Sequence, residues 1–262
     1  MGGRVITITS GKGGVGKTTT TANLGVALAR RGKRVVCLDA DIGLRNLDVV
    51  LGLENRIVYD IVDVVEGRAK LRQALIKDKR LPELNLLPAA QTRDKTAVSE
   101  KNMVTVCDAL RHEFDFILID SPAGIEHGFR TAIAPADQVL IVTTPEVSAV
   151  RDADRIIGLS ESAGKPTPSL IINRLRPAMV KRGDMLDVND VLEVLAIELI
   201  GIVPEDEMII TSTNKGQPAA LDGKSPAGNA FTRIAARLLG DNVPFQFEAE
   251  GLLDRESKFW KK

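Results

Sequence analysis

The sequence predicts an α/β fold in which a mostly parallel, twisted sheet is flanked by helices on both faces. The first observation is an alternation along most of the 262 residues, in which short apolar runs are followed by segments of helical periodicity. The second is composition, because 44% of the residues are hydrophobic but only 3% are aromatic, which favours a core of Val, Ile, Leu and Ala. No repeat or long linker interrupts the series, so we expect one large domain.

The apolar runs are expected to form the strands. Each is short and is followed by polar or turn-forming residues, as is typical of buried parallel strands. They cover residues 5–8, 34–38, 84–87, 114–119, 138–143, 169–172 and 199–203.

The helices are expected between and after these strands. Their apolar residues recur with helical spacing, and many of the segments begin at a polar residue or end just before a glycine. They cover residues 18–31, 57–66, 99–112, 148–163, 188–197 and 225–239. We therefore predict a domain over residues 1–241, a connecting tail over residues 242–250 and a short amphipathic helix over residues 251–262.

Charge and cysteine content narrow the class of protein. Lys plus Arg and Asp plus Glu number 35 each, so no global basic field is available to hold nucleic acid, although a local patch remains possible. Cys37 and Cys107 are far apart, which gives little support to a disulfide, a zinc site or a cluster. The first strand starts too early for a cleavable signal, and no apolar run approaches the ~20 residues of a membrane span. We expect a cytoplasmic protein.

A glycine-rich loop carries the strongest functional signal. Residues 11–18 match Gly-x-x-x-x-Gly-Lys-Thr between the first strand and the first helix, the context that a phosphate-binding P-loop requires. Backbone N–H groups and the helix N-terminus would cradle phosphate oxygens. Lys17 would contact the β- and γ-phosphates, and the Thr18 hydroxyl would bind Mg²⁺. The expected nucleotide-binding residues are Gly11, Lys12, Gly13, Gly14, Val15, Gly16, Lys17, Thr18 and Thr19.

Acidic residues follow two of the predicted strands. Asp39 and Asp41 come after the second strand, and Asp120 ends the strand in "FDFILID". Because open α/β sheets bind ligands at the carboxyl ends of their strands, we favour a functional role over capping or simple solvation. Asp120 is expected to hold Mg²⁺ through water, and Gly124 fits a flexible switch that senses the γ-phosphate.

Lys12 is not required by the P-loop motif and could be a solvated loop residue. However, "KGGVGKTT" resembles the deviant Walker A motif of the MinD/ParA family of P-loop ATPases. The resemblance extends over nearly the whole chain and is greatest to the branch that places the bacterial division septum. The segments that carry it include "DADIGLRNLD", "LPAAQTRDK", "DSPAGIE", "PEVSAVRDADRI", "RGDML" and "GIVPED".

The resemblance implies roles for residues of the nucleotide site. Lys12 would cross a dimer interface to the nucleotide of the other subunit, much as an arginine finger does. Asp41 would orient the attacking water, and Asp39 would assist around Mg²⁺. Asn173 could be an ordinary turn former, but by resemblance it recognises adenine. The facing base-binding loop would be Pro204, Glu205 and Asp206.

The resemblance also implies a partner surface and a membrane anchor. The helix after the predicted fifth strand would contact MinC- and MinE-type partners through Val147, Arg151, Asp152 and Asp154, although each could equally lie on a solvated face. At 100° per residue, the apolar residues of the last segment fall within roughly a third of the helix circumference, as in a membrane-targeting helix. Packing back onto the domain is the alternative. The apolar residues expected to contact the membrane are Leu252, Leu253, Phe259 and Trp260.

The expected function is an ATPase that converts ATP and water to ADP and phosphate, weakly alone and faster with dimerisation and a partner. ATP/ADP and Mg²⁺ are the expected ligands, and the ATP-bound form would be a homodimer. It would bind an anionic membrane surface, which in a bacterium is the inner face of the cell membrane. If the host is a plastid, the protein would lie in the stroma and on the envelope. A ParA-like DNA segregation ATPase and a flagellar-placement relative are the alternatives. Balanced charge argues against the first, and no specific nucleic acid is expected.

Overall fold

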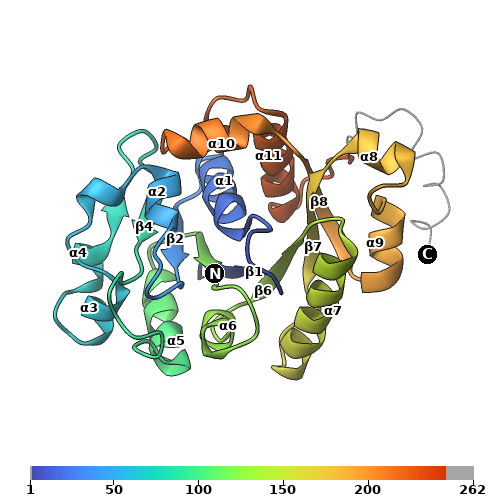
Figure 1. Ribbon diagram of the computed structural model, residues 1–262. Helices are drawn as coiled ribbons and strands as arrows, with labels where there is room; N and C mark the ends of the chain where they lie inside the picture. Colours follow the sequence, from blue (N-terminus) through green and yellow to red (C-terminus); the bar gives the residue numbers. More distant parts are fainter. Residues whose placement is uncertain (1, 246–262) are drawn as a thin grey trace.

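The computed structural model describes residues 2–245, so the expected membrane helix and most of the connecting tail lie outside the described residues. The fold class is confirmed, because one sheet has the strand order β3-β4-β2-β5-β1-β6-β7-β8 and is parallel except where β3 meets β4 (Figure 1). The strands are β1 (Arg4–Thr9), β2 (Val35–Asp39), β3 (Ile76–Lys77), β4 (Leu84–Leu87), β5 (Phe116–Asp120), β6 (Gln138–Thr143), β7 (Ser169–Leu175) and β8 (Glu198–Pro204).

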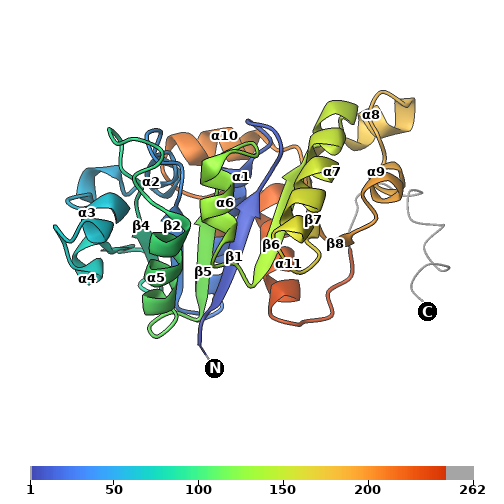
Figure 2. The same cartoon turned by 90° about the horizontal axis from the view of Figure 1, so that it is seen from below.

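Helices cover both faces of this sheet (Figure 1, Figure 2). One face carries α1 (Lys17–Ala29), α2 (Leu47–Leu51), α10 (Glu207–Asn214) and α11 (Pro226–Leu238). The other carries α3 (Ile61–Val65), α4 (Leu71–Ala74), α5 (Glu100–Leu110), α6 (His127–Ile133) and α7 (Val147–Ser162), with α8 (Pro177–Arg182) and α9 (Val188–Leu195) near the β8 edge. None of the helices between residues 2 and 245 is long and apolar enough to cross a membrane.

Alternating side chains divide the core between the two faces. In β1, Ile6 and Ile8 join the cluster under α1 and α11, whereas Val5 joins the cluster under α3 and α5. This is the period of two that a strand buried on both faces imposes. Cys37 is a packing residue, since a Cβ added at Gly25 of α1 would lie 2.4 Å from its sulfur. Glycine in α1 therefore allows the helix to lie close to β2.

The predicted strands all form, but several boundaries and short elements differ. The helix expected over 57–66 is shorter, because the Asp60 side chain accepts the backbone N–H groups of Val62 and Asp63 and starts α3 at Ile61. The strand expected over 114–119 begins at Phe116. The elements that the sequence did not predict are β3, α2, α4, α6, α8, α10 and two 3₁₀ turns, Glu54–Arg56 and Ala219–Leu221.

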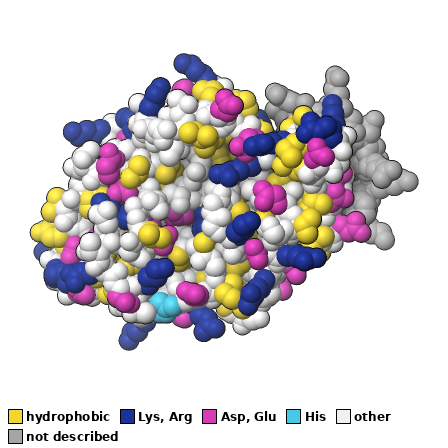
Figure 3. All heavy atoms as spheres, viewed as in Figure 1, with side chains coloured by type: hydrophobic (Ala, Val, Ile, Leu, Met, Phe, Trp, Pro, Cys, Tyr) yellow, Lys and Arg dark blue, Asp and Glu magenta, His cyan; other side chains and the backbone are white. Residues whose placement is uncertain are grey.

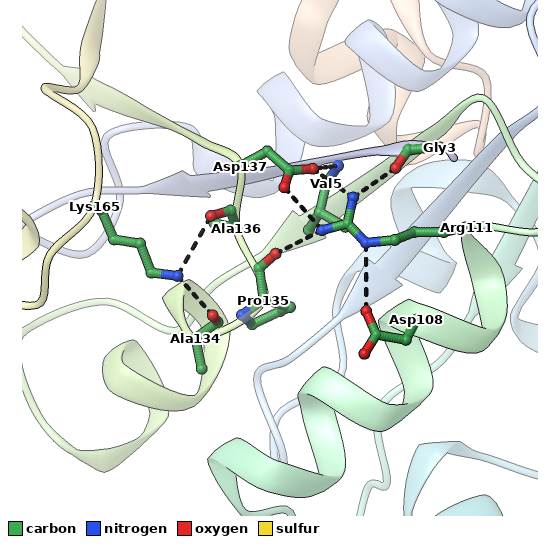
Figure 4. Close-up of polar contacts among 9 residues, drawn as sticks. All are labelled: Gly3, Val5, Asp108, Arg111, Ala134, Pro135, Ala136, Asp137 and Lys165. Atoms are coloured by element: carbon green, nitrogen blue, oxygen red, sulfur yellow. Dashed lines mark hydrogen bonds and ion pairs between the residues drawn. The ribbon is translucent and has the colours of Figure 1, made fainter. Parts of the chain in front are cut away.

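A polar network fixes the end of the sheet where the strands begin (Figure 4). The Arg111 guanidinium donates to both carboxylate oxygens of Asp137 at 2.6 and 2.9 Å, and to the Gly3 carbonyl at 2.6 Å. Asp137 also accepts the backbone N–H of Val5 at 2.8 Å. The network thus joins the end of α5 to the starts of β1 and β6 and leaves the opposite edge for ligands.

Candidate functional site

The glycine-rich loop connects β1 to α1 at the carboxyl edge of the sheet. Gly14 and Gly16 have φ values of 79° and 100°, which side-chain-bearing residues rarely adopt. Gly16 is the N-cap of α1, and a Cβ there would also lie 2.3 Å from the Asn173 side-chain nitrogen. The backbone path of the loop therefore depends on glycine at these positions, and it presents the N-terminus of a helix of 13 residues.

Lys17 is buried at the start of α1. Its Nζ donates to the Ser10 hydroxyl at 3.0 Å. Burial lowers the pKa of Lys17, and the charges of Asp120 and Asp41 oppose that shift. Because burial disfavours the charged ammonium, an anion bound directly beside it, such as a phosphate group, would stabilise that charge.

Asp120 and Asp39 are paired carboxylates at the ends of neighbouring strands. They are directly opposite in the β2–β5 register, and both are buried. Burial raises the pKa of Asp120 to about 8, and the charge of Asp39 adds to the shift, while hydrogen bonds from Thr18 and Thr21 oppose it. Burial likewise raises the pKa of Asp39 to about 6. Two such carboxylates favour a bound cation.

The donor set fits Mg²⁺ held partly by a nucleotide. Among the residues that the structure describes, no three His, Cys, Asp or Glu side chains gather as a closed metal cage. Mg²⁺ commonly needs only one or two carboxylates together with phosphate oxygens and water. Thr18 and Asp120, which the sequence predicted as metal residues, lie close together, since the Thr18 hydroxyl is one of the groups that lower the pKa of Asp120.

Asp39 also has a structural role that was not predicted from the sequence. Its Oδ1 accepts the N–H of Asp41 at 2.9 Å, and its Oδ2 accepts the N–H groups of Asn46 and Leu47 at 3.1 Å each. These bonds fold the loop between β2 and α2 around the carboxylate. The role that the structure shows for Asp39 is therefore to anchor the loop that carries Asp41.

Asp41 and Gly124 lie on the two loops that flank the phosphate cradle. Asp41 is half-buried; burial raises its pKa, and the charges of Lys95 and Lys17 oppose the shift. Gly124 has φ of 93° and donates its N–H to the Ser10 carbonyl at 3.3 Å. The predicted switch residue thus contacts the residue just before the P-loop.

A pocket of about 180 Å³ lies beside the P-loop. The Asn173 side chain, at the end of β7, donates to the Val15 carbonyl at 2.8 Å, which brings β7 and the P-loop together. The predicted residues Thr19, Asn173, Pro204, Glu205 and Asp206 all line this pocket, as do Gly16, Arg174, Ile209, Ile210 and Phe231.

Three of the pocket residues could not be found by spacing. Arg174 follows Asn173 with a φ of 57°, and Ile209 and Ile210 come from α10, which the sequence did not predict. Ile210 leaves 64% of its surface exposed, which is high for a large aliphatic side chain. An apolar wall beside polar groups suits a nucleobase.

Asp206 serves the pocket indirectly. Its carboxylate accepts the N–H of Met208 at 2.9 Å as the N-cap of α10, and it also accepts the Ser225 hydroxyl and the Ala227 N–H. These bonds tie α10 to the start of α11. The side chain predicted to contact the base is therefore engaged in holding the wall of the pocket.

Lys12 points to a different place from Lys17. Its Nζ lies 3.5 Å from the Ser148 hydroxyl of α7. A Cβ added at Gly11 would lie 2.4 Å from the Asp152 carbonyl oxygen, so the loop packs directly on α7. The additional lysine consequently lies against the helix that was expected to meet partners.

The α7 surface combines exposed apolar and charged groups. Val147 is 57% exposed, Arg151 and Asp154 are exposed, and Asp152 is half-buried. A groove of about 620 Å³ runs between α7 and α9, and Val194 of α9 is 55% exposed on its other side. Over the face seen in Figure 3, cations and acids are interspersed and form no large patch of one sign.

Comparison with known proteins gives consistent matches. A family model described as the CobQ/CobB/MinD/ParA nucleotide binding domain matches residues 6–219. A septum site-determining protein MinD from Synechocystis sp. is 59% identical over 243 residues, which are 92% of this chain and 91% of that protein. A chain of the MinC:MinD cell division protein complex from Aquifex aeolicus has 52% identity and a TM-score of 0.87, covering 93% of this chain and 98% of its own. Septum site-determining MinD from Pyrococcus horikoshii, complexed with Mg-ADP, has 32% identity and a TM-score of 0.81, covering 90% and 95%.

Proposed function

The chain belongs to the CobQ/CobB/MinD/ParA family of nucleotide-binding proteins, and on that premise we propose that it is an ATP-driven switch that directs placement of the division septum. The observation that carries the proposal is the position of the P-loop, which lies between a pair of buried carboxylates and helix α7. The family match over residues 6–219 spans both the nucleotide site and α7.

The reaction is hydrolysis of ATP to ADP and phosphate. A water oxygen attacks the γ-phosphorus while the bond from that phosphorus to the β–γ bridging oxygen breaks, leaving ADP. We assign the water to Asp41, whose half-buried carboxylate can accept its hydrogen bond and its proton. Lys17 balances the charge on the phosphate oxygens. Bound Mg²⁺ would neutralise phosphate charge, with Thr18 and Asp120 as the residues that hold it.

Dimerisation would complete the site. Within one subunit Lys12 lies by Ser148 of α7, whereas Lys17 lies by Ser10 at the centre of the cradle. We propose that in the ATP-bound homodimer Lys12 reaches the nucleotide of the other subunit. Turnover would be slow in a monomer because one cation is missing, and faster in the dimer.

The membrane role rests on the pattern of residues 251–262, which lie outside the described part of the chain. One short amphipathic helix binds lipid weakly, but two copies joined in a dimer gain effective concentration. We propose that the ATP-bound dimer resides on the anionic inner face of the cell membrane and that hydrolysis releases it to the cytoplasm.

Partner binding would use the exposed side of α7. The structural relative in a MinC:MinD complex supports a MinC-type partner, and we propose that a MinE-type protein triggers hydrolysis through the same surface. Val147, Arg151 and Asp154 are exposed there, and Asp152 packs against the P-loop at Gly11. A partner bound to α7 would thereby contact the element that supports Lys12.

The direct test is co-sedimentation with anionic liposomes in ATP and in ADP. We compare the intact chain with a chain that ends at Glu250 and with an intact Lys17→Ala variant, which keeps the C-terminal residues. The proposal expects the intact chain to pellet in ATP but not in ADP, and both variants to stay in the supernatant. Equal pelleting in both nucleotides, or pelleting of the truncated chain, would contradict the membrane switch.

A further inference from the structure

The C-terminal ends of α2 and α10 meet at two glycines. A Cβ added at Gly52, the C-cap of α2, would lie 2.6 Å from the Gly216 carbonyl oxygen, and one added at Gly216 would lie 2.5 Å from the Gly52 Cα. Their φ values of 66° and 60° are ones that residues with side chains rarely adopt. The two helices, which lie side by side on the α1 face (Figure 1), are therefore in backbone contact, and the position of one limits that of the other.

Arg80 bridges the same two helix ends. Its guanidinium donates to the Gly216 carbonyl at 2.7 Å and to the Leu51 carbonyl of α2 at 2.5 Å. The buried Asp78 orients this guanidinium, because its carboxylate accepts Nε at 3.1 Å and Nη2 at 2.7 Å. A planar group with donors in fixed directions thus holds both carbonyls, an arrangement that the single ammonium of a lysine would not reproduce.

Each helix leads from this junction to a different part of the nucleotide site. Helix α2 begins at Leu47, whose N–H donates to Asp39, the residue that anchors the loop carrying Asp41. Helix α10 carries Ile210, part of the apolar wall of the base pocket. Arg80 therefore lies between that wall and the loop with the proposed water-orienting carboxylate.

We propose that Arg80 is a positioning residue for ATP hydrolysis, which couples the base pocket to the loop that carries Asp41. A base against Ile210 restrains α10, Arg80 transmits this restraint to α2, and α2 fixes the loop from which Asp41 orients the water. The proposal rests on the function proposed above, which assigns the water to Asp41. Loss of the bridge should slow the chemical step and leave most ATP binding intact, because α10 keeps its cap by Asp206.

The test measures kcat and KM for ATP with the full-length chain and Mg²⁺. Arg80→Lys keeps a positive charge beside the buried Asp78, so it should fold, but it should lower kcat about fivefold with KM changed less than about twofold. Arg80→Gln should lower kcat at least as much. Arg34→Gln is the matched control with wild-type kcat expected, since it loses an arginine paired with Asp115 where the strands begin.

Ile210→Ala distinguishes coupling from a general loss of structure. This variant should lower kcat at saturating ATP about fivefold, because the base no longer restrains α10. The double variant Arg80→Lys/Ile210→Ala should lower kcat no further, since both substitutions interrupt the same connection. Independent structural effects would instead multiply to about twenty-fivefold.

Three results would overturn the coupling: wild-type kcat in either Arg80 variant, wild-type kcat in Ile210→Ala, or a double variant whose losses multiply. Asp41→Asn separates this failure from failure of the proposed function. If the wild type hydrolyses ATP and Asp41→Asn does not, the role of Asp41 stands whatever the Arg80 variants show. If Asp41→Asn hydrolyses ATP as fast as the wild type, the role of Asp41 is wrong and the coupling through Arg80 falls with it.

Discussion

At the scale of single residues, the carboxylates Asp39 and Asp120 dominate the electrostatics of the site. Their pKa values of about 6 and 8 are raised chiefly by burial, while the same groups in an unfolded chain titrate near 4. The folded protein without a cation therefore holds protons that the unfolded chain releases. At these two groups, between about pH 4 and 8 the unfolded state binds fewer protons, so their contribution to the free energy of unfolding falls as pH rises.

We expect the melting temperature of the nucleotide-free protein to fall from pH 5 to pH 8. Asp120→Asn removes the group with the higher pKa, so this variant should melt on the order of 3 °C above the wild type at pH 8 and show a weaker dependence on pH. Thermal denaturation at constant ionic strength checks both. A wild-type melting temperature that rises over this range would contradict the raised pKa values of the two carboxylates.

Gly11 gives a second prediction at this scale. Its Cβ would lie 2.4 Å from the Asp152 carbonyl, so Gly11→Ala must push the P-loop away from α7, at a cost of about 1 to 3 kcal/mol in unfolding free energy. We expect ATP binding to weaken as well. Gly158→Ala is the matched control, because α7 offers open space there and alanine favours the helix. Urea denaturation and ATP titration measure both effects; equal behaviour of the two variants would refute the close packing of loop and helix.

Site residues could be predicted from the sequence where a motif determines their position, and could not where tertiary packing does. Lys17, Thr18 and Asp120 follow a motif whose spacing itself determines their geometry. Ile209 and Ile210 do not, because they reach the pocket only after loops and helices far apart in sequence have packed. The apolar wall of the pocket could therefore not be predicted from the sequence.

At the scale of elements, the strands were predicted well and the short helices were not. Buried parallel strands are continuous apolar runs, which the sequence displays directly, as in β5 and β6. Helix α2 has only 5 residues, too few to show a clear apolar stripe, and α10 has 8 residues, none of which is fully buried. They form because Asp39 and Asp206 satisfy the backbone N–H groups at or before their first turns.

Asp206 allows a test of how α10 supports the base pocket. Asp206→Ala removes the cap and the bonds to the start of α11, so we expect about 1 kcal/mol of destabilisation and a severalfold weaker affinity for ATP. Asp187→Ala removes the comparable cap of α9, which does not line this pocket. It should cost similar stability and leave ATP affinity unchanged. Chemical denaturation and nucleotide titration distinguish the two; equal affinity in both variants would show that the α10 wall does not contact the base.

At the scale of the whole molecule, the parallel sheet brings distant residues to one edge. The strand order places β1 between β5 and β6, so the P-loop, Asp120 and the start of α7 converge although they are far apart in sequence. The family and the fold could be predicted because the motifs occupy strand ends. The anchoring role of Asp39 and the contact of Lys12 with α7 required the folded structure.

In the proposed switch, a dimer completes each site with Lys12 from the other subunit. Mixing Lys12→Ala with Asp41→Asn tests it, because each variant alone should be inactive. In a mixed dimer, one site would combine an intact Asp41 with Lys12 of the partner subunit. Random pairing should restore about a quarter of wild-type ATPase activity, since half of the dimers are mixed and each has one intact site. If the mixture is no more active than the separate variants, Lys12 does not act across the interface.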